Sequence, residues 1–321
     1  MEELSSTTVP CAAQIQQLRD SIAQVIVGQK QATDLLLTSI IAKGHVLIEG
    51  VPGVAKTLLA RIMARLIDAR FSRIQFTPDL MPSDVLGTTV YNMKTSEFDF
   101  HPGPVFADVV LADEINRAPA KTQAALFEVM EERQVTIDGT THSMSDVFTI
   151  IATQNPVEQE GTYKLPEAQL DRFLMKINMG YPTTDEEVEI LNRHQANNAF
   201  AQTSDIQPIL TATQLDTMRQ AAQAVRIEPS LMRYIAEIVG STRHSKAVYL
   251  GASPRAAVAI LDAAKAYALI QERTFVIPDD IKAIAPYVMH HRLLITAEAE
   301  MQGYTPMQVV QRLIDKVEVP Q

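Results

Sequence analysis

Apolar residues recur along the chain in two patterns, one of helical period and one of short continuous runs. Between about residues 12 and 42 the spacing predicts two amphipathic helices, interrupted at 27–29. Runs of strand length cover residues 45–49, 73–76, 109–112 and 148–153. Helical stretches at about 56–68 and 121–133 fall between these runs. Alternation of this kind predicts an α/β fold, a mainly parallel sheet with helices on both faces.

Two segments interrupt this alternation with hairpin signals. Residues 135–137 run into Asp138-Gly139, a strong two-residue turn signal, and predict a hairpin at about 133–147. A weaker pattern alternates around residues 94–97 and predicts a second hairpin at about 88–101. Tyr91, Phe98 and Phe100 in this second segment could form an apolar grip or could simply pack.

Helical signals dominate after about residue 181. Residues 184–187, Thr-Asp-Glu-Glu, have the pattern of a capping box. Ser253-Pro254 and Thr305-Pro306 each place an N-cap residue before a proline at the first helical position. We therefore expect an α/β core domain at 1–181 and a smaller, all-α domain at 182–321.

Composition and charge exclude several classes of function. The chain has 321 residues and a net charge of −10, so general binding to nucleic acid or to anionic membranes is not expected. Cys11 is the only cysteine, which fits a reducing compartment. Residues 1–6 lack the features of a signal peptide, and no apolar run approaches the ~20 residues of a membrane span. We expect a cytoplasmic protein that does not insert into a membrane.

A glycine-rich turn between the run at 45–49 and the next helix has the pattern of a phosphate-binding loop. It reads Gly50, Val51, Pro52, Gly53, Val54, Ala55, Lys56 and Thr57, with Leu58 opening the helix. Such a loop turns its backbone N–H groups toward a phosphate, while Lys56 reaches the β- and γ-phosphates and the Thr57 hydroxyl holds Mg²⁺. Ala55 stands where the pattern has glycine, and we expect it to adopt a right-handed backbone. The alternative is an ordinary strand–turn–helix.

Polar residues that end two other apolar runs would complete a nucleotide-hydrolysing site. The run at 109–112 leads into Asp113 and Glu114. Carboxyl ends of parallel strands share one sheet edge, so Asp113 could orient the water shell of Mg²⁺ and Glu114 could act as general base. Asn155 follows the run at 148–153 and could position the attacking water. Solvated acids and a plain turn are the alternatives.

Two arginines are further candidates. Arg172 follows Asp171, and a surface ion pair with that or a nearby acid is the simplest interpretation. Arg255 lies in the first turn of the helix after Ser253-Pro254, where a cation opposes the helix dipole. A phosphate partner would explain that position.

Six motifs give the chain a resemblance to the MoxR-family AAA+ ATPases, which are P-loop proteins with a helical lid. They lie at residues 27–29, 50–57, 111–119, 152–156, 165–173 and 251–255 and span nearly the whole chain. The Ala-Lys-Thr ending of the loop is usual in this family, so Ala55 is part of its signature.

The resemblance assigns roles to residues that spacing alone does not. It implies that Val27, Gly28 and Gln29 pack near the adenine base. It also implies that Asn155 is the first sensor, Arg172 an arginine finger toward a neighbouring subunit, and Arg255 the second sensor, which reports nucleotide state to the lid. Residues 88–101 resemble the helix-2 insert, and 133–147 resemble the hairpin before the first sensor.

The resemblance further implies ATP and Mg²⁺ as ligands, ADP as product, and a homo-oligomeric ring, a hexamer. The expected work is chaperone-like: maturation or assembly of a client protein, or insertion of a metal cofactor into it, together with partners that carry a von Willebrand factor A domain. Two alternatives remain open at this stage. One is the AAA+ motor subunit of a metal chelatase, and the other is a nucleotide-gated binding module with little turnover.

Overall fold

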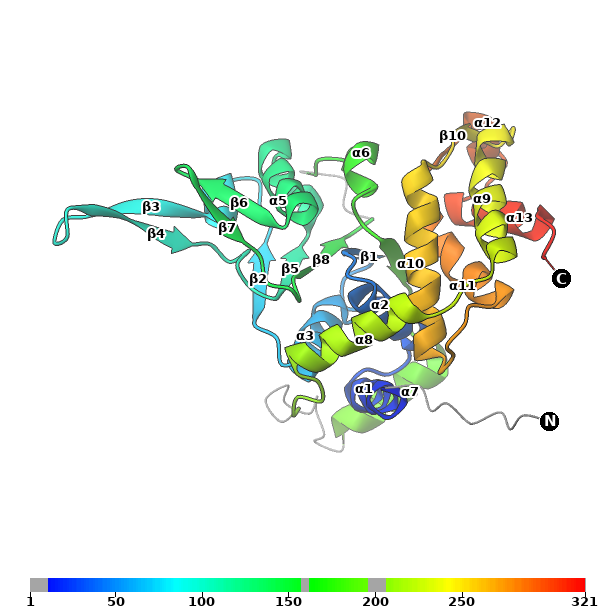
Figure 1. The fold of residues 1–321 in the computed structure, drawn as a ribbon, viewed down its shortest axis with the longest axis horizontal. Coiled ribbons are helices and arrows are strands. Elements are labelled where there is room, and N and C mark those ends of the chain that lie inside the picture. The colour runs from blue at the N-terminus through cyan, green and yellow to red at the C-terminus, as the bar shows by residue number, and fades with distance from the viewer. Residues whose placement is uncertain (1–10, 157–161, 196–205, 321) are drawn as a thin grey trace.

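The computed structural model describes residues 11–156, 162–195 and 206–320. At its centre lies a five-stranded parallel sheet in the order β2-β5-β8-β1-β9 (Figure 1). The strands are β1 (Val46–Gly50), β2 (Phe71–Gln75), β5 (Val109–Asp113), β8 (Thr149–Gln154) and β9 (Met175–Met179). Four of them coincide with the apolar runs in the sequence, and the predicted α/β fold is confirmed.

Helices cover both faces of this sheet. They are α1 (Ala12–Val25), α2 (Lys30–Ile41), α3 (Lys56–Leu66) and α5 (Ala120–Glu132), with the short elements α4 (Pro82–Leu86), η1 (Ile115–Arg117) and α6 (Glu167–Leu170). Alternate residues of β1 serve opposite faces: Val46 and Ile48 pack in the cluster of α2 and α3, and Leu47 packs in the cluster of α5. Successive side chains of a strand point to opposite faces of the sheet, and helices cover both faces here. Every position of the strand therefore favours an apolar residue, which explains the continuous apolar run.

Two antiparallel hairpins project from one side of the sheet (Figure 1). They are β3 (Gly87–Asn92) with β4 (Glu97–Pro102), and β6 (Gln134–Ile137) with β7 (Thr140–Ser143). The second turns at Asp138 and Gly139, both with positive φ, as the dipeptide predicts. Phe100 stacks on His142 at a centroid distance of 4.4 Å and so packs the hairpins together, whereas Tyr91 and Phe98 are exposed.

The region after residue 181 is helical, as expected. Its elements are α7 (Thr184–Gln195), α8 (Ala212–Ala224), α9 (Pro229–His244), α10 (Pro254–Ile270), α11 (Pro278–Met289), α12 (Ala297–Met301) and α13 (Pro306–Lys316), with a small sheet of β10 (Val248–Leu250) and β11 (Leu294–Ile295). None of the helices in the described part of the chain is long and apolar enough to cross a membrane.

The predicted cap of α7 is wrong by one residue. Thr183, not Thr184, accepts the backbone N–H of Glu186, and the Glu186 carboxylate accepts the Thr183 N–H at 2.8 Å. Two threonines in succession made both registers possible, and the capping box that forms leaves Glu187 outside. Ser253 and Thr305 are the N-cap residues of α10 and α13, as predicted.

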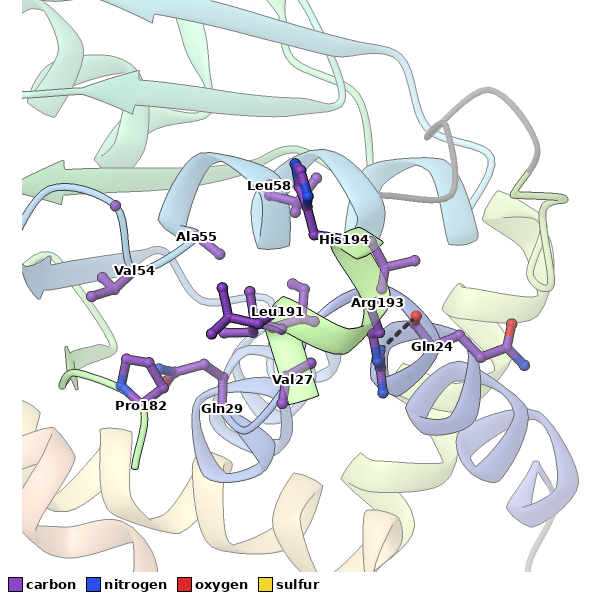
Figure 2. Close-up of a pocket in the computed structure, with 14 residues that line it drawn as sticks. Gln24, Val27, Gln29, Val54, Ala55, Leu58, Pro182, Leu191, Arg193 and His194 are labelled. Atoms are coloured by element: carbon purple, nitrogen blue, oxygen red, sulfur yellow. Dashed lines mark hydrogen bonds between the residues drawn. The ribbon is translucent and has the colours of Figure 1, made fainter. Parts of the chain in front are cut away.

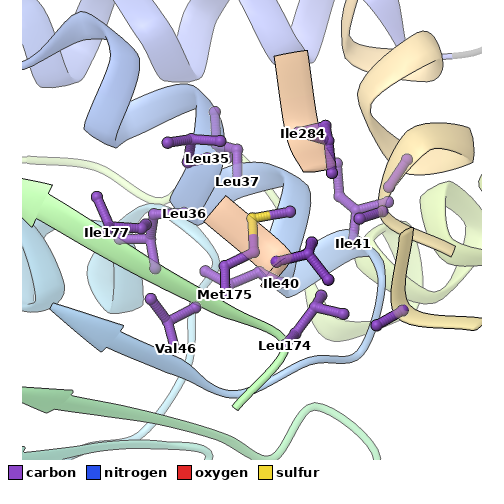
Figure 3. Packing of buried hydrophobic residues seen from close by; sticks show 14 of the residues in the cluster. Leu35, Leu36, Leu37, Ile40, Ile41, Val46, Leu174, Met175, Ile177 and Ile284 are labelled. Carbon is purple, nitrogen blue, oxygen red and sulfur yellow. The ribbon is translucent and has the colours of Figure 1, made fainter. Parts of the chain in front are cut away.

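The lid helices and the sheet share one hydrophobic core (Figure 3). Leu36 and Ile40 of α2 are buried against Met175 and Ile177 of β9, and Ile284 of α11 closes the same cluster. This packing fixes the lid against the β9 side of the sheet.

Candidate active site

The glycine-rich loop joins β1 to α3 at the carboxyl edge of the sheet. A side chain at Gly50 would place its Cβ 2.6 Å from the carbonyl oxygen of Met179, so only glycine fits there. The Lys56 ammonium donates to the carbonyl oxygens of Gly50 and Val51, the latter at 3.0 Å. The lysine therefore lies across the mouth of the loop, where a phosphate group would meet it.

Ala55 has a left-handed backbone, with φ of 66° and ψ of 22°. The expectation of a right-handed conformation was wrong. The turn from the loop into α3 requires positive φ at this position, and the methyl group accepts a strain of roughly 1–2 kcal/mol relative to glycine.

Asp113 ends β5 beside Thr57 and is almost fully buried. The Thr57 hydroxyl donates to Asp113 Oδ2 at 3.4 Å, and Thr153 donates to Oδ1 at 2.5 Å. Hydroxyl and carboxylate oxygens are the ligands that Mg²⁺ prefers, so this pair fits a magnesium ion. Arg73 also donates to Oδ2, at 2.7 Å. Because this oxygen already has a partner, we expect Asp113 to contact the ion through a bound water and not directly.

Glu114 follows with its backbone in the left-handed region, φ 57°. Its carboxylate accepts a hydrogen bond from the Gln75 amide at 2.8 Å and pairs with Arg117 at 2.9 Å. Gln75 in turn accepts from Arg73 at 2.6 Å, and Arg73 also pairs with Asp113. One network thus joins both acidic residues across two neighbouring strands, β2 and β5.

Asn155 lies one residue beyond β8 and is 5% exposed. β8 runs parallel to β1 with Gln154 opposite Glu49, so Asn155 falls at the level of Gly50, where the loop begins. The structure therefore brings Asn155, Asp113 and the loop to one edge of the sheet.

A cavity of about 230 Å³ opens beside the loop (Figure 2). Val27 and Gln29 line one side, Val54, Ala55 and Leu58 another, and Ile190 and Leu191 of α7 close it. Its apolar lining suits the face of a purine. Gly28 has φ of 76°, and a Cβ there would lie 2.7 Å from the Glu186 carboxylate, which explains the glycine.

Arg172 and Arg255 lie at the other edge of the sheet. β9 begins at Met175, opposite Val46, so Arg172 precedes the amino end of the strands. A five-residue strand separates the two edges by about 16 Å. Arg172 and Arg255 meet at one carboxylate, Glu131 at the end of α5, with N–O distances of 3.7 and 3.2 Å. Neither arginine lines the cavity beside the loop of its own chain.

Sequence reasoning missed several contributors to this geometry. Arg73, Gln75 and Thr153 reach the acidic pair because β2, β5 and β8 are neighbours in the sheet. The one sequence signal for these three residues is that each lies near the end of a strand. That signal identifies them as part of the site only when the order of the strands is known. Of the two kinds of partner considered for Arg172, Asp171 pairs instead with Arg292 at 2.7 Å, and the acid beside Arg172 is a glutamate, Glu131.

Comparison with known proteins identifies the family. Residues 45–175 match the model of the ATPase family associated with various cellular activities (AAA), and residues 240–313 match an AAA lid domain. The chaperone MoxR1 of Mycobacterium tuberculosis is 45% identical over 97% of this chain and 84% of its own length. The protein belongs to the MoxR family of AAA ATPases.

Other relatives agree with this assignment. The protein MoxR of Methylorubrum extorquens is 31% identical over 88% of both chains. A crystal structure from Cytophaga hutchinsonii, of a protein described only provisionally as an ATPase, superimposes with a TM-score of 0.88. It is 42% identical and covers 97% of this chain and 96% of its own. As an AAA ATPase of the MoxR family, this protein binds ATP; the roles of individual residues stay predictions.

Proposed function

We propose that this MoxR ATPase hydrolyses ATP at sites shared between two copies of the chain in a ring, with six subunits. The observation that carries the proposal is the opposite placement of the two halves of the site. The loop and Asp113 lie at the carboxyl edge of the sheet, and Arg172 and Arg255 lie at the amino edge. Head-to-tail contact between copies would bring one edge to the other, and repeated contacts of this kind close into a ring.

The chain's own residues supply the chemistry at the carboxyl edge. The backbone N–H groups of the loop and the Lys56 ammonium bind the phosphates, and Glu114 accepts the proton of the attacking water. The water oxygen bonds to the γ-phosphorus as the bond to the β–γ bridging oxygen breaks, and Asn155 orients that water. Thr57 and Asp113 would hold Mg²⁺, which neutralises phosphate charge when bound. Arg172 of the next copy stabilises the charge on the γ-phosphate.

The contacts of Glu114 fit a role as base. Gln75 and Arg117 both contact Oε2 of its carboxylate, so Oε1 can accept the proton of the water while these two contacts hold the side chain in place. The Gln75–Arg73–Asp113 network connects this orientation to the site of the cation.

The work done with ATP is chaperone-like remodelling of a client protein in the cytoplasm, together with partners that carry a von Willebrand factor A domain. The relative named as a chaperone supports this class of work, and the MoxR relatives favour it over a chelatase motor. The projecting hairpins, with exposed Tyr91 and Phe98, are the surfaces we assign to contact with client or partner.

Two measurements test the proposal. ATPase activity per subunit should rise with protein concentration as shared sites assemble, and a flat profile from dilute monomer upward would remove the shared site. Glu114→Gln should bind ATP normally but lose at least about tenfold in turnover, because the general base is absent. Undiminished hydrolysis by this variant would remove Glu114 as the base.

A further inference from the structure

The two arginines at the amino edge share a single counter-ion. Arg255 Nη2 lies 3.2 Å from Glu131 Oε1, and Arg172 Nη1 lies 3.7 Å from Oε2 of the same carboxylate. Arg172 comes from the segment before β9 and Arg255 from the first turn of α10, so Glu131 joins the core to the lid.

The backbone that carries both arginines is fixed. Arg172 also donates to the Phe127 carbonyl oxygen at 2.6 Å. Arg292, almost fully buried, binds the Asp171 carboxylate at 2.7 Å and the Phe173 carbonyl oxygen at 2.8 Å. Ser253, the N-cap of α10, donates to Asp171 at 3.4 Å. Both arginines are therefore carried by backbone segments that are held in place, and both guanidinium groups contact the same carboxylate.

Cationic residues outnumber acids around this pair, although the chain is acidic. A cavity of about 510 Å³ at this edge is lined by five cationic residues, Lys43, Arg133, Arg172, Arg255 and Arg292, and by two acids, Glu131 and Asp262. Arg292 is paired with Asp171 and Lys43 with Asp216, whereas Arg172 and Arg255 share one carboxylate and so keep a net positive charge that attracts a multivalent anion. Glu131 supplies part of the neutralisation from within the chain.

The ion pairs at Glu131 are exchangeable. The side chain of Glu131 is 38% exposed and that of Arg255 is 64% exposed, so each pair is screened and worth little. A terminal phosphate offers more charge and a better match to two planar guanidinium groups than one carboxylate does.

We propose that Glu131 is a positioning residue that holds Arg172 and Arg255 together on this face and gives them up to the terminal phosphate of ATP bound by a second copy of the chain. This inference rests on the proposed function. The carboxylate thus competes with the neighbour's nucleotide, so displacement of the carboxylate by the triphosphate favours productive association of the subunits.

The test compares Glu131→Gln with Glu132→Gln, an exposed acid beside it on α5. Loss of the competing charge in Glu131→Gln should lower both the protein concentration for half-maximal activity and the KM for ATP. We expect the half-maximal protein concentration and the KM each to fall roughly three- to tenfold, and kcat to change less than twofold. Glu132→Gln should alter none of these values. Adding Arg255→Ala to Glu131→Gln should remove most of the gain in assembly, measured by sedimentation with a non-hydrolysable ATP analogue.

Outcomes of this test separate the two proposals. If the wild-type protein shows no concentration dependence, the shared site itself is wrong. If it does, and Glu131→Gln leaves the half-maximal concentration and KM unchanged or raises them, the role of Glu131 alone is overturned. Equal gains in Glu131→Gln and Glu132→Gln would show a general charge effect and would also overturn it.

Discussion

Among single residues, Ala55 most clearly links backbone conformation to the site. Its φ of 66° directs the chain from the loop into α3, and Lys56 and Thr57 follow immediately. A left-handed alanine is uncommon because its methyl group crowds the carbonyl oxygen. The two residues that would bind phosphate and metal are therefore oriented by a strained turn.

Substitution of Ala55 should reveal this strain. In Ala55→Gly, relief of the left-handed conformation is offset by the greater freedom of glycine in the unfolded chain, so the free energy of unfolding should change by less than about 1 kcal/mol. Ala55→Val should be destabilised by more than about 1 kcal/mol, because a branched side chain tolerates positive φ poorly. Urea denaturation checks both, and equal stability of the alanine and valine proteins would contradict the observed backbone.

The residues of the site differ in how far the sequence predicts them. The loop and the pair Asp113-Glu114 are contiguous motifs whose spacing encodes their geometry. Gln75 and Thr153 cannot be found in this way, because they reach the acidic pair across neighbouring strands. The positive φ of Ala55 could not be predicted from the sequence either, because an alanine gives no sequence signal for a left-handed turn.

At the level of elements, buried histidines connect helices to strands. His45, before β1, accepts the Ile150 N–H at 2.9 Å and lies 3.2 Å from the Met130 carbonyl oxygen. Burial lowers its pKa to about 3. At the end of α11, burial lowers the pKa of His290 to about 4 and that of His291 well below its ordinary value. All three are neutral in the folded protein near pH 7.

Stability should therefore fall in mild acid. These pKa values are lower in the folded chain than the ordinary 6.5, so the unfolded chain binds protons first as pH falls. The contribution is complete above about pH 6.5 and is lost progressively toward pH 4, by up to about 1.4 kcal/mol per pH unit for each histidine. Urea midpoints at pH 7, 6 and 5 measure this. His45→Gln should make the slope shallower, and an unchanged slope would contradict the assignment.

The sequence predicts the three central strands and β2, but not β9, which is one of the two outer strands of the sheet. β9 was missed because Lys176 and Asn178 alternate with apolar residues over only five positions. It lies at the edge of the sheet beside β1, where one side of the ladder has no neighbouring strand. The predicted cap of α7 was one residue too late in the sequence, because either of two adjacent threonines could begin the capping box.

At the scale of the whole molecule, the parallel sheet separates the nucleotide loop from the arginine pair. Every strand runs from the amino edge, with Arg172, Arg255 and Glu131, to the carboxyl edge, with the loop and Asp113. The two groups lie about 16 Å apart in one chain, so a single chain cannot place both of them at the same nucleotide. The family is fixed by the relatives, whereas the shared site is an inference from this separation.

The most direct test of the shared site mixes two defective proteins. Lys56→Ala lacks the phosphate-binding lysine, Arg172→Ala lacks the arginine, and each alone should lose at least about tenfold in ATPase activity. In an equal mixture, intact loops of one variant meet intact arginines of the other, so about a quarter of wild-type activity should return if subunits combine at random. A mixture of Arg172→Ala with the double variant, which contains no Arg172, is the control. We predict that ATPase activity recovers in the first mixture and not in the control mixture. If the proteins in the first mixture still assemble but no activity returns, the shared site is contradicted.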